Sequence, residues 1–148
     1  MENFDSELEK RVWKRVRGEE QPAPMGLKGL MAAEQNEAAV YLMLARQMQG
    51  KEKNMLRRMF EQEQMHATCL RGMHMVMTGQ PLAVRTPPVT PQTPEIALRK
   101  CYGRKLRTMA EYENRTNDRE YGAVFAQLAQ QEREHCLQLL EILGNLRR

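Results

Sequence analysis

Apolar residues recur every three or four positions along most of this chain, with charged and amide residues between them. This spacing is typical of helices that bury one face and expose the other. Gly50, Gly79 and Gly144 are expected to end helices, because glycine readily adopts the left-handed conformation that follows a last helical turn. Val, Ile and Thr are sparse, so no sheet is expected. The predicted helices lie at about residues 5–17, 25–49, 52–78, 94–115 and 118–143.

Residues 80–94, which link the third and fourth of these helices, contain five prolines, the last at the start of the fourth helix, so this stretch is not expected to be helical. Extended chain over residues 80–94 spans about 45 Å, at roughly 3.1 Å per residue. A helix over residues 52–78 is about 40 Å long. The stretch can therefore cross the whole length of a helical bundle. The alternative is a flexible linker between two separate helical hairpins, but neither hairpin could bury its apolar faces alone.

These elements predict an all-α fold, a ferritin-like four-helix bundle in up-down-down-up order with a long crossover between its second and third helices. The bundle is expected over residues 25–148, with residues 80–94 as the linker. Residues 1–24 form a separate N-terminal amphipathic segment, which is expected to pack across the bundle or against a second subunit. A homodimer could use this segment or an exposed face of the bundle.

A glutamate and a histidine interrupt the apolar stripe of two predicted helices in the same way. Glu63 and His66 do so in the helix at 52–78, and Glu132 and His135 do so in the last helix. A shift of 69 residues lays one pair on the other. A carboxylate that faces an apolar core is costly unless it is paired or bound to a metal. The two pairs therefore indicate a metal site in the bundle core.

Glu34 lies in the apolar stripe of the helix at 25–49 and at a depth similar to that of Glu63, when both are measured from the turn at Gly50. Glutamate and histidine are the ligands expected for iron or manganese in such bundles, and zinc is a further candidate. The expected metal ligands are Glu34, Glu63, His66, Glu132 and His135. The alternative is that these are exposed side chains on ordinary amphipathic helices.

The sequence resembles the rubrerythrin branch of the ferritin-like superfamily over about residues 27–144. Ala33 and Glu34, followed by Tyr41 and Ala45, are similar to the first ligand helix of that family. The Glu-x-x-His segments 63–66 and 132–135 are similar to the second and fourth ligand helices. The resemblance implies a non-haem dimetal centre, usually of two iron ions, that reacts with peroxide or oxygen, with Tyr41 beside the ligands.

The sequence departs from the family in two respects. No Cys-x-x-Cys pair occurs, so a rubredoxin-type domain is absent and an external electron donor would be needed. The third bundle helix should also supply a glutamate at the depth of the site, which is near Arg104, but none lies there. The residues that could substitute are Glu37, Glu111 and Tyr102. The site could instead hold one metal ion, or none, with Arg104 or Lys105 neutralising the carboxylates.

Three functions are compatible with these residues. The first is a cytoplasmic iron oxidoreductase of the rubrerythrin type, active against peroxide or oxygen in oxidative stress. The second is a metal-binding or iron-handling protein without turnover. The third is a degenerate bundle that serves as a structural or partner-binding module.

The composition indicates the compartment and the partners that these functions would involve. Three cysteines without close pairing favour free thiols in a reducing compartment. The N-terminus does not resemble a signal peptide, and no apolar run is long enough to span a membrane. The net charge of +4 comes without a base-reading motif, so nucleic acid is not an expected partner. The C-terminal segment 143–148 resembles peptides that dock cargo into encapsulin shells, and a simple helix end is the alternative.

Overall fold

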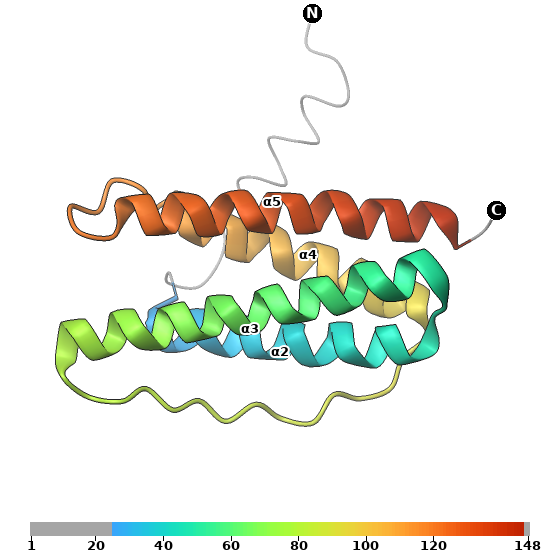
Figure 1. The fold of residues 1–148 in the computed structure, drawn as a ribbon, viewed down its shortest axis with the longest axis horizontal. Coiled ribbons are helices and arrows are strands. Elements are labelled where there is room, and N and C mark those ends of the chain that lie inside the picture. Colours follow the sequence, from blue (N-terminus) through green and yellow to red (C-terminus); the bar gives the residue numbers. More distant parts are fainter. Residues whose placement is uncertain (1–24, 147–148) are drawn as a thin grey trace, which may run out of the picture.

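The computed structural model describes residues 25–146 of the chain, and within them all regular structure is helical (Figure 1). The four helices are α2 (Leu27–Gln47), α3 (Gly50–Thr78), α4 (Pro94–Glu113) and α5 (Gly122–Asn145). None of them is long and apolar enough to cross a membrane. The predicted N-terminal helix at 5–17 lies outside the described residues, and so do the last two residues of the C-terminal segment.

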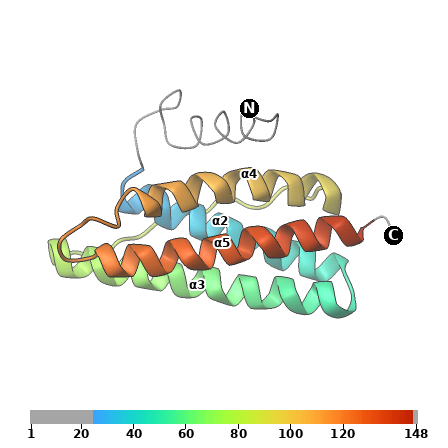
Figure 2. The ribbon, with the colours of Figure 1, turned by 90° about the horizontal axis from the view of Figure 1, so that it is seen from above.

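The helices form a bundle in up-down-down-up order, as predicted. α2 and α3 form one antiparallel hairpin and α4 and α5 form the other, while the linker returns along the full length of the bundle (Figures 1 and 2). α3 and α4 therefore run in the same direction. This arrangement confirms the long crossover that the prolines predicted.

The linker at 79–93 packs against the bundle, although it has no regular structure. Leu82 and Val84 contact one part of the core, and Val89 contacts another. The hydroxyl of Thr86 donates a 2.7 Å hydrogen bond to Oε1 of Gln35 on α2. These contacts hold the linker along one path on the surface of the bundle, so it is not a flexible connection between two separate hairpins.

Two turns differ in detail from the predictions. Gly50 begins α3 at a φ of +62°, and the preceding helix already ends at Gln47. The last helix begins at Gly122, about one turn later than expected, because Oδ1 of Asp118 accepts hydrogen bonds from the amides of Glu120 and Tyr121 in the preceding turn. That helix also continues past Gly144. Gly79, at a φ of +71°, does end α3 as predicted.

The core consists of two apolar clusters with a polar layer between them. One cluster lies toward the turn between α2 and α3 and includes Leu44, Leu56 and Leu139. The other lies toward the opposite end and includes Leu30 and Leu70. All of these side chains are fully buried. The polar layer is therefore screened from water along the bundle axis.

Candidate metal centre

The polar layer contains all five residues that the sequence predicted as metal ligands, and it also contains Lys105. Each helix contributes at least one of them: Glu34 on α2, Glu63 and His66 on α3, Lys105 on α4, and Glu132 and His135 on α5. All six side chains are at most 2% exposed. Such a concentration of charge in a protein interior requires compensation inside the layer.

The first half of the layer is organised around the Nδ1 atom of His66. This nitrogen lies 2.6 Å from Oε2 of Glu34, 3.0 Å from Oε1 of Glu132 and 3.7 Å from Oε2 of Glu63. The four residues each offer one ligand atom, and these atoms lie within 4.8 Å of one another. We call this place the His66 position. Its three carboxylates and one imidazole are a donor set that suits iron, manganese or zinc.

The second half of the layer is organised around the ammonium group of Lys105. Its Nζ atom lies 2.5 Å from Oε1 of Glu63, 2.5 Å from Oε2 of Glu132 and 3.7 Å from Oε1 of Glu34. His135 adjoins this half, because its Nδ1 atom lies 2.7 Å from the same oxygen of Glu63. We call this place the Lys105 position.

Each of the three carboxylates therefore directs one oxygen toward each position. Glu132 directs Oε1 toward His66 and Oε2 toward Lys105, and Glu34 and Glu63 are divided in the same way. Carboxylates that bridge two cations have this arrangement. The predicted ligands are thus brought together, but His66 and His135 serve different halves of the layer.

Lys105 reaches the layer because it lies on the buried stripe of α4, with Leu98, Cys101, Thr108 and Tyr112. These positions follow the helical spacing of three and four residues. The shift of 69 residues that aligns the two Glu-x-x-His pairs places Gly103 opposite Glu34, but Gly103 is exposed. The sequence predicted Lys105 only as one of two residues that could neutralise the carboxylates, and its place on this buried stripe is the signal that distinguishes it from Arg104.

The three substitutes proposed for the missing carboxylate are not part of this cluster. Glu37 is buried, but its Oε1 atom accepts a 2.6 Å hydrogen bond from Nε of Arg104. Glu111 pairs with Arg115 at 2.8 Å, one turn along the same helix. Tyr102 packs, partly buried, against the apolar cluster that contains Leu44. Lys105 is thus the side chain that α4 places among the carboxylates.

Two glutamines hold the outer nitrogens of the histidines, and sequence reasoning missed both. Nε2 of His66 donates a hydrogen bond to Oε1 of Gln131, and Nε2 of His135 donates a 2.6 Å hydrogen bond to Oε1 of Gln62. Each glutamine immediately precedes the glutamate on the facing helix, so the repeated motif is Gln-Glu-x-x-His. This arrangement keeps a proton on Nε2 of each ring and turns Nδ1 toward the carboxylates.

Replacing Gln131 with alanine is expected to weaken metal binding by about 10- to 100-fold, because the ring of His66 loses the group that orients it. The dissociation constant for Mn²⁺ measures this effect. Gln130→Ala is the matched control, since Gln130 is exposed and bonds only to the neighbouring Arg133. Equal dissociation constants for the two variants would contradict the role given to Gln131.

The pKa values of the layer follow from burial and close charges. Burial lowers the pKa of His66, but hydrogen bonds to Glu132, Glu34 and Glu63 raise it to about 12. Burial also disfavours the charged form of Lys105, but the neighbouring carboxylates hold its pKa well above the usual value. Glu63 has a pKa well below the usual value despite its burial, because Lys105 and both histidines stabilise the carboxylate. Glu34 has a raised pKa because of burial and repulsion by the other two glutamates.

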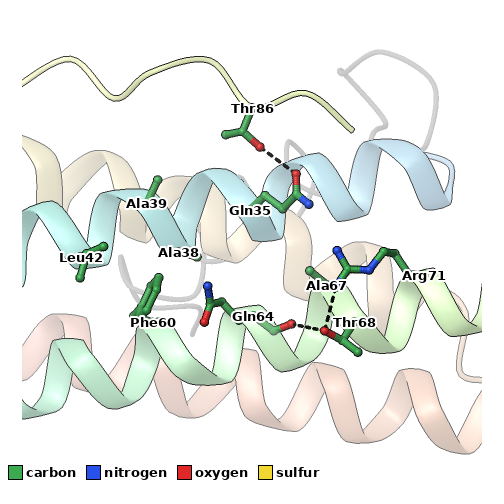
Figure 3. A pocket seen from close by; sticks show the side chains of 10 residues that line it. All are labelled: Gln35, Ala38, Ala39, Leu42, Phe60, Gln64, Ala67, Thr68, Arg71 and Thr86. Atoms are coloured by element: carbon green, nitrogen blue, oxygen red, sulfur yellow. Dashed lines mark hydrogen bonds between the residues drawn. The ribbon is translucent and has the colours of Figure 1, made fainter. Parts of the chain in front are cut away.

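Two hollows lie near the layer, and one of them reaches it. A pocket of 180 Å³ between α3 and α5 is lined by His66, Gln131, Met65 and Cys69, among others. A larger groove of 720 Å³ lies beneath the linker on the outer side of α2 and α3, and Figure 3 shows its alanine-rich floor and its polar rim. The groove is lined by none of the six side chains of the layer, so of these two hollows it is the smaller pocket that borders the candidate site.

The residues present fit one metal ion better than two. Three buried carboxylate oxygens accept no hydrogen bond of good geometry: Oε2 of Glu63, toward the His66 position, and Oε1 of Glu34 and Oε2 of Glu132, toward the Lys105 position. Oxygens of this kind are suited to a nearby cation. At the Lys105 position the ammonium group already lies between the carboxylates. Glu34, Glu63, His66 and Glu132 are thus the residues that could hold an ion.

Facing helices that bring carboxylate and imidazole groups together in the core of a crossover bundle define a ferritin-like protein with a candidate metal site. The family model described as Rubrerythrin matches residues 27–143, and the chain belongs to this family. No curated protein and no solved structure matches the chain significantly.

Proposed function

We propose that this protein binds one non-haem iron ion at the His66 position and uses it to reduce peroxide or oxygen with electrons from an external donor. The observation that carries the proposal is the buried group formed by Glu34, Glu63, His66 and Glu132, whose ligand atoms lie within 4.8 Å of one another. Membership of the Rubrerythrin family supports iron as the metal. Manganese and zinc have similar ligand preferences and are the alternatives.

The surroundings of the site suit a small oxidant. The pocket between α3 and α5 leads to the ring of His66, and its 180 Å³ admits a molecule of the size of peroxide. The apolar clusters on both sides exclude bulk water from the layer. A bound iron ion would pass the donor's electrons on one at a time, by cycling between its ferrous and ferric states, so that each peroxide would require two such cycles.

The protein's own side chains hold the site and a proton beside it. Gln131 keeps Nδ1 of His66 directed inward. Lys105 carries protons at Nζ, which lies 2.5 Å from Glu63 and 2.5 Å from Glu132, two of the residues that would hold the ion. Reduction of one hydrogen peroxide to two waters consumes two electrons and two protons. The electrons are assigned to a separate donor, since these 148 residues contain no Cys-x-x-Cys motif.

The proposal is tested by loading the purified protein with ferrous iron without oxygen and then adding hydrogen peroxide. Bound iron is expected to be oxidised and peroxide consumed, and an added reductant should sustain turnover. His66→Ala should abolish both, whereas His74→Ala, a control eight residues along the same helix, should preserve them. Retention of less than a tenth of an equivalent of iron by the unaltered protein would refute the proposal.

A second function, metal binding without turnover, is favoured by one observation. The helix that should supply the last carboxylate supplies Lys105 instead, so the site lacks the donors for a second ion. A protein of this kind would bind ferrous iron but would consume no peroxide beyond the first oxidation of the bound ion. The same experiment, followed through several additions of reductant, separates the two functions.

A further inference from the structure

We propose that the ammonium group of Lys105 is a built-in cation that takes the place of a second metal ion and limits this centre to one. The inference concerns the metal site of the proposed function, but it depends only on how many ions the layer accepts. It does not require that any bound ion be redox-active.

The main support for this proposal is the position of the ammonium group of Lys105. Lys105 is fully buried, and its Nζ atom bridges Glu63 of α3 and Glu132 of α5 at 2.5 Å each. The same carboxylates direct their other oxygens toward His66. Carboxylates in a dimetal centre are shared between two cations in this way. Lys105 therefore stands where the second cation would be.

The position of His135 supports the same conclusion. Its Nδ1 atom lies 2.7 Å from the oxygen of Glu63 that also contacts Lys105. Nε2 of His135 is held by Gln62, just as Nε2 of His66 is held by Gln131. His135 is thus oriented as a terminal ligand, but the place that it faces is taken by an ammonium group.

The charges of the layer also favour one ion. When a bound ion displaces the proton from Nδ1 of His66, three ionised carboxylates and one ammonium group leave an excess of two negative charges, which a single divalent ion neutralises. A second divalent ion would leave two uncompensated positive charges in the interior, which is costly. Removing the ammonium group and adding a carboxylate would change this balance in favour of a second ion.

The test is a titration with Mn²⁺, in which electron paramagnetic resonance counts the ions that remain free. The unaltered protein is expected to bind one ion per chain, and Lys105→Glu is expected to bind two. Lys100→Glu, an exposed position on the same helix, should still bind one. Adding His135→Ala to Lys105→Glu should return the count to one, because the second ion loses its imidazole ligand.

Several outcomes would overturn the inference. Two ions in the unaltered protein would show that Lys105 blocks nothing, and one ion in folded Lys105→Glu would show that it is not the reason for the limit. If Lys105→Glu does not fold, Lys105→Met serves instead. It should bind a single Mn²⁺ with a dissociation constant lowered by roughly tenfold or more, because a nearby positive charge is gone, and an unchanged constant would oppose the inference.

The inference and the proposed function can fail separately. An unaltered protein that binds no Mn²⁺ and no iron refutes the proposed function. If Lys105→Glu then gains ions, the role of Lys105 is supported all the same. If the unaltered protein binds one redox-active iron ion and Lys105→Glu does not gain another, only the inference fails.

Discussion

Replacing Glu63 with alanine is expected to lower the free energy of unfolding by about 3–5 kcal/mol, because removal of one partner leaves uncompensated buried charges. Glu63 is the most connected anion of the layer. Its Oε1 atom contacts Lys105 at 2.5 Å and His135 at 2.7 Å, and its Oε2 atom lies 3.7 Å from His66. Without this carboxylate, Lys105 and His66 would face a cavity.

Urea denaturation in the presence of a chelator measures this loss at neutral pH. Glu61→Ala is the matched control, since Glu61 is exposed on the same helix and its replacement should change stability by less than about 0.5 kcal/mol. Added Mn²⁺ should not restore the stability of Glu63→Ala, because the variant has lost a ligand. A variant as stable as the control would show that the layer is not held by Glu63.

Replacing Lys105 with methionine is expected to destabilise the metal-free protein by a similar amount, about 3–5 kcal/mol, because three buried carboxylates lose their cation. Unlike the loss in Glu63→Ala, this loss should be reversed by metal, which supplies positive charge to the same carboxylates. At a Mn²⁺ concentration of one hundred times the dissociation constant, binding contributes about 2.7 kcal/mol.

The measurement compares urea denaturation of Lys105→Met in chelator and in Mn²⁺. Lys100→Met is the control for the loss of a lysine from the same helix. Because Lys100 is exposed, this variant should be nearly as stable as the unaltered protein. If Mn²⁺ does not restore the stability that Lys105→Met has lost, the ammonium group and the metal do not neutralise the same carboxylates.

Much of the bundle follows from local patterns. The stripe on α3 that contains Glu63 and the stripe on α5 that contains Glu132 are buried as predicted, because side chains at helical spacing share one face whatever their partners are. The crossover was predictable for a different reason. Proline excludes a helix there, and the number of residues determines how far an extended chain can reach.

The division of the site into a His66 position and a Lys105 position could not be predicted from the spacing of residues along the sequence. The repeat shift compares backbone depth, and it placed Gly103 opposite Glu34, whereas the long side chain of Lys105 brings its charge into the layer from a neighbouring position. The partition between His66 and His135 depends on which oxygen of each carboxylate faces which cation. That choice arises only when four helices pack together.

The turn before α5 was also misjudged by about four residues, for a local reason. Asp118 is a good helix-capping residue, but its carboxylate oxygen caps an isolated turn at Glu120 and Tyr121. The helix starts afterwards at Gly122, where the backbone passes so close to the oxygen of Thr116 that a Cβ atom would lie 2.4 Å from it. Close approach of this kind depends on the path of the turn.

Anomalous X-ray scattering from crystals of the unaltered protein, grown with iron or manganese, would show how many metal ions lie beside Lys105. We expect one anomalous peak per chain, within bonding distance of Glu34, Glu63, His66 and Glu132, with the ammonium group of Lys105 still between Glu63 and Glu132. Two peaks with Lys105 displaced from the layer, or no peak at all, would contradict this expectation.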